Sequence, residues 1–405
     1  MSHAASGQGG NSIIVRQYNE RVILSALRRL GEASKADLAR QASLTQNTAG
    51  QIVRELELQK LVRSVGKRSG ARGQPATMLR LDPDGAYSIG VKLGRRSTDA
   101  LLVDFSGNVL EAHRQERVFP RPDEALNLVL AEIEALRGRI PITTHGRLAG
   151  VGLAMPYNLG SWRRELGLSR DLCAAWAEFD LAAELRKRLD VSVFVENDGT
   201  AVAVAELFGG LGREFDDFVS VFIGTAIGGG LVLRGECRQG ATSNAGDIGL
   251  MPTSPSLLAS SPPPERPSEL LLTRASVGSL IRHLDANGVR AASRAELEAA
   301  ISGHPALVGE WIEDCADALV NPLLSIASVL DVEAIVINGD LPPRLIDQLL
   351  RRLETLLAQA APEARQPPKL RFGTVGRNAA ALGAAILPFH FNYSPVQQIL
   401  FGTGA

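Results

Sequence analysis

Near the start of the chain, apolar residues recur at helical spacing, at Ile23, Leu24, Leu27 and Leu30. Gly31 then supplies a stop signal for this first helix. Ser34 and Asp37 have the separation of a capping box, with Asp as a shorter substitute for Glu. They predict a second helix that ends near Ala42.

A third helix is predicted after a short turn. Thr45 can cap the segment QNTAGQIVRELELQK, whose apolar positions face back into a core at Ile52, Val53 and Leu56. A short helix, a tight turn and a longer capped helix make a helix-turn-helix. The first turns of the third helix carry polar side chains suited to base edges, namely Gln46, Asn47, Thr48 and Gln51, and Arg54 on the same helix joins the expected DNA-contacting set. A three-helix bundle with a polar face is the alternative.

The next stretch, LVRSVGKRSGARGQPATMLRL, predicts a strand, a flexible loop and a returning strand that ends at Leu81. The loop carries three cations, Lys67, Arg68 and Arg72, together with glycines. Such a loop suits the wing of a winged helix, because cations on a flexible loop can follow DNA phosphates. The sequence therefore predicts a winged helix-turn-helix DNA-binding domain over residues 16–82, after a disordered lead-in over residues 1–15.

From Ala86 onward, β-rich runs alternate with helical ones, which is typical of an α/β fold. The predicted strands are YSIGVKL, DALLVDF, GVGLAMP, VSVFVEN, FVSVFIG, GGLVLRG and EAIVING. Helices are expected at about 123–137, 181–189, 198–208, 305–329, 343–358 and 378–387. A hairpin with a Gly-rich turn occurs twice, in SIGVKLGRRSTDALLVD and in VSVFIGTAIGGGLVLRG. Two similar halves indicate the duplicated ribonuclease-H-like fold of actin and the sugar kinases, a two-lobed body over residues 86–405 with a ligand cleft between the lobes.

Composition adds little, but charge is unevenly distributed. The chain of 405 residues is 45% hydrophobic, has three distant cysteines and contains no long apolar run, so we expect a cytoplasmic protein. The polar N-terminus lacks the pattern of a signal peptide. Residues 1–80 carry a net charge of +8, and the remaining residues carry −9. A basic head on an acidic body is common in DNA-binding proteins, although a basic solvated surface is the alternative.

Motifs in family order make the resemblance specific. The head segment ADLARQASLTQNTAGQIVRELELQKLV is followed in the body by GVGLAMP, VENDGTAVAVAELFGG, IGTAIGGGLVLRG and NAGDIGL. From about Asn19 to Leu387 the chain resembles the ROK family (repressors, open reading frames and kinases), and within it the winged-helix regulators similar to the xylose and N-acetylglucosamine repressors. This resemblance implies a sugar or sugar-like effector and operator DNA as partners.

The resemblance also implies an effector site. Asp198, in the triplet Glu196-Asn197-Asp198, matches the aspartate that activates a sugar hydroxyl in the family's kinases. Asn197, Asp198 and Asp247 are the expected effector-binding residues, although Asp198 could simply cap a helix. Leu250 replaces a family histidine, and MPTSPSLLASSPPPERPSE replaces the cysteine cluster that holds zinc. We therefore expect no metal and no cofactor.

The phosphate-binding features of the kinases are altered. Lys92 stands where a kinase needs a magnesium-facing aspartate, and Arg95 and Arg96 add bulk where phosphates approach the backbone. The glycines of IGTAIGGG could serve a tight hairpin as well as an anion. We therefore predict a kinase-dead, sugar-responsive regulator rather than an enzyme, which binds a palindromic operator as a homodimer or higher homo-oligomer. A DNA-binding protein whose body is only an oligomerisation scaffold, and an active sugar kinase, are the alternatives.

Overall fold

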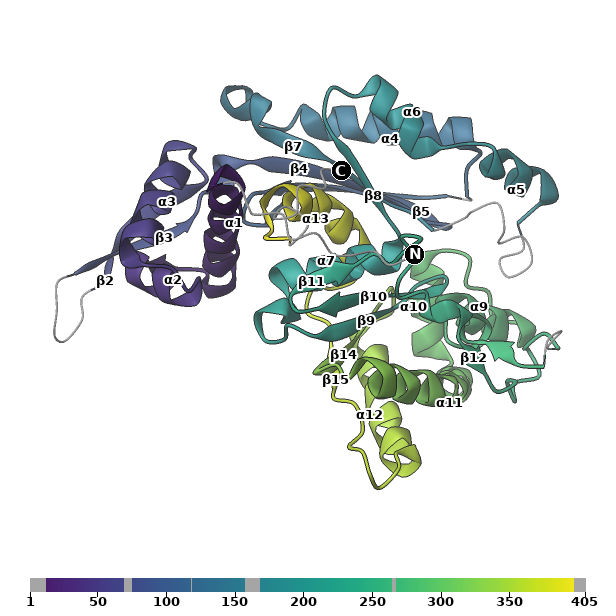
Figure 1. The fold of residues 1–405 in the computed structure, drawn as a ribbon. Helices are drawn as coiled ribbons and strands as arrows, with labels where there is room; N and C mark the ends of the chain where they lie inside the picture. Colours follow the sequence, from purple (N-terminus) through teal and green to yellow (C-terminus); the bar gives the residue numbers. More distant parts are fainter. Residues whose placement is uncertain (1–11, 69–74, 118, 157–167, 264–266, 397–405) are drawn as a thin grey trace, which may run out of the picture.

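The computed structural model describes residues 12–68, 75–117, 119–156, 168–263 and 267–396. Figure 1 shows a small N-terminal head beside a body of two lobes. The head and both lobes are joined by continuous packing, because one hydrophobic cluster runs from Ile23 and Leu27 in the head to Phe105 and Phe389 in the body. Within the described ranges, every helix is too short or too polar to cross a lipid bilayer.

The head is a three-helix unit with a small sheet. Its elements are α1 (Ser12–Leu30), β1 (Ala33–Ser34), α2 (Lys35–Gln41), α3 (Gln46–Leu58), β2 (Val62–Arg68) and β3 (Ala76–Leu81), with strand order β1-β3-β2. Both predicted caps are present. The Ser34 hydroxyl accepts from the Asp37 amide at 3.2 Å and the Asp37 carboxylate accepts from the Ser34 amide at 3.1 Å, which completes the capping box. Thr45 accepts from the Thr48 amide at 3.2 Å.

The first helix is longer than its hydrophobic pattern indicates. It begins at Ser12, so residues 12–15 belong to α1 rather than to the lead-in, and residues 1–11 lie outside the described residues. An ion pair one turn apart, Arg16–Glu20 at 3.3 Å, and the contact of Arg16 with Glu55 at 3.2 Å support this extra turn.

The two lobes contain sheets of the same design. Lobe 1 has the strand order β6-β5-β4-β7-β8, built from β4 (Tyr87–Leu93), β5 (Ser97–Asp104), β6 (Val109–Glu116), β7 (Leu148–Ala154) and β8 (Val193–Glu196). Lobe 2 has the order β11-β10-β9-β14-β15, built from β9 (Phe218–Ile223), β10 (Ile227–Leu233), β11 (Glu236–Arg238), β14 (Ala334–Gly339) and β15 (Leu370–Phe372). In each sheet three antiparallel strands are followed by two parallel ones. This repetition confirms the predicted duplicated fold.

Two helices lie between the sheets, α7 (Asp198–Gly209) and α13 (Ala379–Tyr393) (Figure 1). Helix α13 packs on β4 and β7, and α7 packs on β10 and against α13. Glycine permits this close approach, because a Cβ at Gly152 would lie 1.8 Å from the Ala384 carbonyl oxygen. A Cβ at Gly230 would lie 2.5 Å from the Ala203 Cβ. The glycines of β10 therefore serve helix packing.

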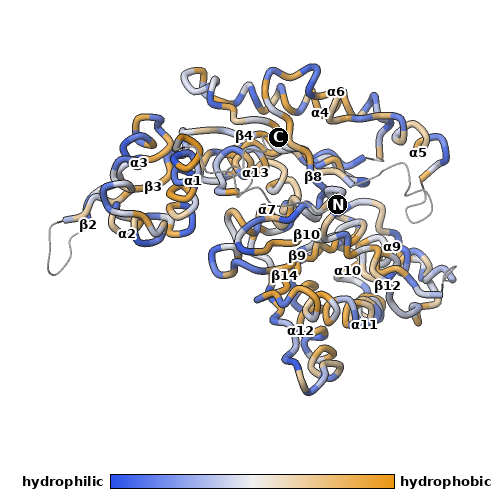
Figure 2. Tube along the Cα trace, in the orientation of Figure 1, coloured by the Kyte–Doolittle hydropathy of each residue, from blue (hydrophilic) through white to orange (hydrophobic). Residues whose placement is uncertain are grey.

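The outer helices cover the remaining faces. Lobe 1 carries α4 (Pro122–Arg137), α5 (Arg170–Ala177) and α6 (Leu181–Arg188). Lobe 2 carries α8 (Leu271–Arg274), α9 (Val277–Ala286), α10 (Arg294–Gly303), α11 (Pro305–Leu330) and α12 (Pro343–Ala360), and a short ladder pairs β12 (Pro252–Thr253) with β13 (Glu269–Leu270). In Figure 2 the hydrophobic colour gathers where α11 and α12 meet the lobe 2 sheet, which matches the largest buried cluster. Edge strand β6, with its exposed and polar pattern, and helices α5 and α8–α10 were not predicted from the sequence.

Candidate DNA-contacting face and interlobe cleft

The predicted recognition residues share one face of α3. Gln46, Asn47, Gln51 and Arg54 are exposed, and residues 47, 51 and 54 recur at the spacing of a single helix face. Thr48 differs from the others. It is half-buried, and its hydroxyl lies 2.8 Å from the Thr45 hydroxyl at the helix cap. Three polar side chains and one cation are therefore available on the exposed side of α3.

The cations of the wing have different surroundings. Lys67 is exposed near the end of β2. Arg68 forms an ion pair with Asp37 of α2 at 3.2 Å, so its side chain also fastens the wing to the helix-turn-helix. The pKa of Asp37 is lowered, first by its hydrogen bonds with Ser34 and then by the charges of Arg68 and Arg40. Arg72 lies outside the described residues.

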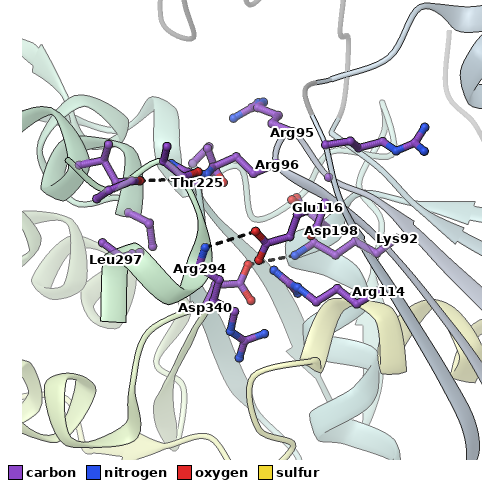
Figure 3. A pocket seen from close by; sticks show the side chains of 18 of the residues that line it. Lys92, Arg95, Arg96, Arg114, Glu116, Asp198, Thr225, Arg294, Leu297 and Asp340 are labelled. Atoms are coloured by element: carbon purple, nitrogen blue, oxygen red, sulfur yellow. Dashed lines mark hydrogen bonds and ion pairs between the residues drawn. The ribbon is translucent and has the colours of Figure 1, made fainter. Parts of the chain in front are cut away.

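A cavity of about 720 Å³ lies between the two lobes (Figure 3). Lobe 1 contributes the β4–β5 turn and the inner ends of β5 and β6, and lobe 2 contributes the start of α9, α10 and the loop after β14. Asp198, the first residue of α7, lines this cavity as expected. The cavity is rich in cations, with Lys92, Arg95, Arg96, Arg114, Arg117, Arg290 and Arg294 in its walls.

The strand register of lobe 1 brings charged residues together in this cleft. Lys92 on β4 is opposite Asp99 on β5, and Asp99 is opposite Arg114 on β6. Residues opposite each other on neighbouring strands have adjacent side chains. Accordingly, Arg114 contacts Asp99 at 2.7 Å.

Lys92 also links the two lobes. Its ammonium group contacts the Asp340 carboxylate, in the loop after β14, at 3.0 Å. It also lies 5.3 Å from the centre of the Phe222 ring. Burial alone lowers the pKa of Lys92, but Asp340, Asp99 and Asp198 outweigh that effect and hold the pKa above its ordinary value. A fixed positive charge therefore stands among carboxylates, at the position that the resemblance assigns to a metal-facing group.

Arg95 and Arg96 lie in the turn between β4 and β5. Arg96 donates to the carbonyl oxygens of Ala291 (2.9 Å) and Ala292, across the cleft in lobe 2. Arg95 is largely buried, and this burial lowers its pKa to about 10 although the charge of Asp198 raises it. The second Gly-rich turn is also occupied by protein contacts, because the carbonyls of Gly224 and Thr225 accept the amides of Val277 and Gly278 at 2.8 and 3.2 Å. Both Gly-rich turns thus make contacts with other protein segments, and Gly94 and Thr225 of these turns also line the cavity.

The three expected effector-binding residues are brought together only in part. Asn197 caps α7, accepting from the Gly199 amide at 2.8 Å, and Asp198 accepts from the same amide at 3.0 Å. Asp247 accepts from the Asn244 side chain at 2.8 Å. Its pKa is raised, first by burial and also by the charge of Asp198. Of the three residues only Asp198 lines the large cavity, and Asp247 lines a smaller pocket of about 220 Å³ beside Ile248 and Met251.

Two residues of this region were missed from the sequence. Asp340 follows a parallel strand at the cleft, and the carboxyl ends of such strands are a common place for functional side chains. The position of Asp340 directly after a predicted strand was therefore a signal in the sequence for a residue at the cleft. Asn244 precedes Asp247 by three positions in the motif NAGDIGL, but only the folded loop shows that the two side chains meet.

The start of the segment that replaces the cysteine cluster is bound to a buried ion pair between α8 and α11. Arg274, 1% exposed, contacts Asp314 at 2.7 Å and Asp317 at 3.0 Å, and it donates to the Ser254 carbonyl at 3.0 Å. Ser256 adds a hydrogen bond to Asp314 at 2.9 Å. Among the residues that the structure describes, no group of three or more His, Cys, Asp or Glu side chains could hold a metal ion.

The fold and the cleft define a two-lobed, ROK-type body with an N-terminal winged helix. The sequence profile of the ROK family matches residues 88–390, which is most of the chain, so the protein belongs to the ROK family. This membership confirms the resemblance drawn from the motifs.

Similar proteins include regulators and kinases. The chain is 27% identical over 377 residues to the uncharacterized protein y4fQ of Sinorhizobium fredii, covering 92% of this chain and 90% of that protein. It is 23% identical to the xylose repressor of Bacillus subtilis over 58% of this chain and 61% of the repressor. The N-acetylglucosamine repressor of Escherichia coli O6:H1 is 24% identical over 63% of this chain and 62% of its own length. The chain thus spans less than two thirds of each of these repressors.

Solved structures share the fold. A ROK family transcriptional regulator, a homolog of the E. coli MLC protein, superposes with a TM-score of 0.67 at 22% identity and covers 96% of this chain and all of its own. A ROK family glucokinase from Streptomyces griseus in complex with glucose and AMPPNP gives a TM-score of 0.59 at 22% identity. The glucokinase covers 75% of this chain and 99% of its own. The likeness to the regulator includes the head, whereas the glucokinase covers a smaller part of the chain.

Proposed function

We propose that this protein is a sugar-responsive transcriptional regulator, a repressor that binds operator DNA through its winged helix and has no kinase activity. The observation that carries the proposal is Lys92. Its ammonium group lies among Asp340, Asp99 and Asp198, where Mg²⁺ would need free carboxylates. The similarity to the xylose and N-acetylglucosamine repressors supports the regulatory part.

For DNA recognition we propose that α3 enters the major groove and that Lys67 and the other wing cations follow phosphates, with two copies of the chain on a palindromic site. The test starts from a duplex selected by the wild-type protein out of a random-sequence library. Gln51→Ala and Asn47→Ala should each reduce discrimination against mismatched duplexes by about 1–3 kcal/mol. Gln59→Ala, the same change at the far end of α3, is the matched control.

Lys67→Gln should weaken binding to all duplexes alike and should reduce the salt slope by about 1. If the wild-type protein selected no sequence from the library, the assignment of a DNA-binding regulator would fail. Equal loss from Gln59→Ala and Gln51→Ala would instead contradict the placement of α3 in the groove.

For the effector we propose a polyhydroxylated ligand that reaches the cleft beside Asp198, with Asn197 and Asp247 as further hydroxyl acceptors. A carboxylate accepts strong, charge-assisted hydrogen bonds from neighbouring hydroxyls. A thermal-shift screen with neutral sugars, sugar acids and sugar phosphates tests this proposal, and the cationic wall of the cleft favours the acidic members. Asp198→Ala should remove the shift, while Asp347→Ala, on the exposed face of α12, should retain it.

The second candidate function is that of a DNA-binding protein whose body is an oligomerisation scaffold without a small ligand. It is favoured by one observation, the position of Asp247 in a separate pocket rather than in the main cavity. Wild-type protein that binds its selected duplex but responds to no compound in the screen would support the scaffold. Magnesium-dependent ATP turnover that disappears in Asp198→Asn would instead identify a kinase.

A further inference from the structure

Helix α1 of the head is attached to both lobes of the body. Near its middle, Arg21 donates to the carbonyl oxygens of Phe391 at 2.9 Å and Ser394 at 3.3 Å, at the end of α13. Near its end, Arg29 contacts Asp216 at 2.9 Å, just before β9 of lobe 2. Because α13 packs on the lobe 1 sheet, the two arginines hold α1 to different lobes.

Between these two attachments lies Arg28, which is only 7% exposed. Its guanidinium carbon is 3.7 Å from the centre of the Phe208 ring and 5.7 Å from that of Phe105. Within the described residues, its Nε and Nη2 atoms are buried without a hydrogen-bond partner. Burial lowers the pKa of Arg28 to about 9. Leaving a buried guanidinium on aromatic faces costs free energy that a simple packing role does not require.

The aromatic rings beneath Arg28 also come from both lobes. Phe105 directly follows β5 of lobe 1, and Phe208 is near the end of α7, which packs on the lobe 2 sheet. Phe389 of α13 touches both, with ring centres at 5.4 Å from Phe105 and 6.1 Å from Phe208. A change in the angle between the lobes would therefore move one ring relative to the other under the same guanidinium.

The junction around Arg28 is the place where α1 packs on the rings of Phe105 and Phe208. Helix α7 connects this junction to the cleft. It starts at Asp198, which lines the cavity, and Phe208 is its penultimate residue. A straight helix of this length spans about 18 Å. The residues between them are almost all buried, so the helix can shift only together with its surroundings.

We propose that α1 senses the angle between the lobes, and that Arg21, Arg28 and Arg29 are positioning residues that set the orientation of the DNA-binding head accordingly. This inference rests on the proposed function. A ligand that closes the cleft would move α7 and lobe 2, and α1 would then have to tilt or lose one attachment. Either response changes the orientation in which α3 approaches DNA.

The test needs no known effector, because Lys92–Asp340 is an ion pair between the lobes that can be broken by mutation. Lys92→Met in the full chain should change the dissociation constant for the selected duplex by about fivefold or more. In an Arg28→Met background the same Lys92→Met change should alter it by less than about twofold. Arg16→Met on the exposed side of α1 is the matched control and should leave the effect of Lys92→Met intact.

Equal effects of Lys92→Met in the wild-type and Arg28→Met backgrounds would overturn the proposal. If Lys92→Met does not fold, Asp340→Asn removes the same ion pair and takes its place. Arg28→Lys should restore part of the coupling, which a merely structural role would not require.

A second measurement separates this inference from the proposed function. Hydrogen exchange of the α1 amides should differ between wild type and Lys92→Met, and this difference should vanish with Arg28→Met. If this exchange result were obtained but the wild-type protein selected no duplex, the sensing role would be supported and the DNA-binding function would be contradicted. Unchanged exchange in α1 would refute the sensing role even if DNA binding were normal.

Discussion

Arg274 and Arg28 are both almost fully buried, yet their surroundings are opposite. Arg274 is surrounded by acceptors, with Asp314, Asp317 and Ser254 all at 3.0 Å or less. Arg28 has aromatic faces around it instead. Burial alone would lower the pKa of Arg274, but its hydrogen bonds with Asp314 and Asp317 and the charges of these carboxylates hold the pKa above its ordinary value. Burial lowers the pKa of Arg28 to about 9.

This difference separates two uses of a buried charge. A buried ion pair with full hydrogen bonding holds a loop in one conformation, and removing one partner leaves the other charge uncompensated. A buried cation on aromatic rings is expected to contribute little to holding the fold, and in the proposal above it responds to movements of the rings. Three measurements on stability test this contrast.

The largest effect is expected at Arg274. Arg274→Met leaves the buried Asp314 without its partner and should lower the free energy of unfolding by about 3–5 kcal/mol, measured by urea denaturation. Arg351→Met, which removes a surface pair with Asp347 at 2.6 Å, should cost less than about 1 kcal/mol. A loss at Arg274 no larger than that at Arg351 would show that the ion pair does not hold the loop.

The next effect concerns acid stability at the junction around Arg28. Burial, with the charges of Arg28 and Arg21, lowers the pKa of His390 to about 4. The folded protein therefore keeps this imidazole neutral while the unfolded chain takes up a proton near pH 6.5. Stability should be full above about pH 6.5 and should fall by about 3 kcal/mol as the pH drops to about 4.

His390→Leu should flatten this pH dependence in urea denaturation between pH 7 and pH 4. His304 is exposed, so His304→Leu serves as the control. This variant should keep the pH dependence of the free energy of unfolding that the wild type shows. Identical slopes for wild type and His390→Leu would mean that the imidazole is protonated inside the fold.

The smallest effect on stability is expected at Arg28 itself. Arg28→Met replaces a charge that lacks hydrogen bonds on two nitrogens with an apolar chain of similar length, so the free energy of unfolding should change by about 1 kcal/mol or less. A loss above about 3 kcal/mol would place Arg28 in the same class as Arg274. The contrast would then disappear.

Much of the fold was predictable because it depends on local signals. The caps at Ser34 and Thr45 depend on side chains within three residues of the helix start, and strand β4 was predicted over its observed bounds. Edge strand β6 was missed because most of its side chains are exposed and polar, so its pattern lacks a buried face. Helices α9 and α10 of lobe 2 were missed although they carry local signals, because α9 buries Val277, Leu280 and Leu284 at helical spacing and Ser293 with Glu296 forms a capping box at α10.

The site was less predictable than the fold, because distant segments form it. Lys92 and Asp198 were identified from motifs, but the partner of Lys92 is Asp340, 248 positions away along the chain. The pairing of Asp99 with Arg114 depends on strand register, which the sequence alone did not supply. Arg28 looked like an ordinary cation of a basic head, and only its packing against Phe208 distinguishes it.

The position of α13 also matters for biosynthesis. Helix α13 leaves the ribosome long after the strands of lobe 1, yet it covers β4 and β7, and Leu101 and Val103 of β5 belong to the same buried cluster. At ordinary rates of translation, roughly 15–60 s separate the appearance of β4 from that of α13. During that interval one apolar face of the first sheet is uncovered. We therefore expect lobe 1 of the nascent chain to be prone to aggregation until α13 emerges, and chains truncated before residue 379 to fail in lobe 1, far from the truncation in sequence.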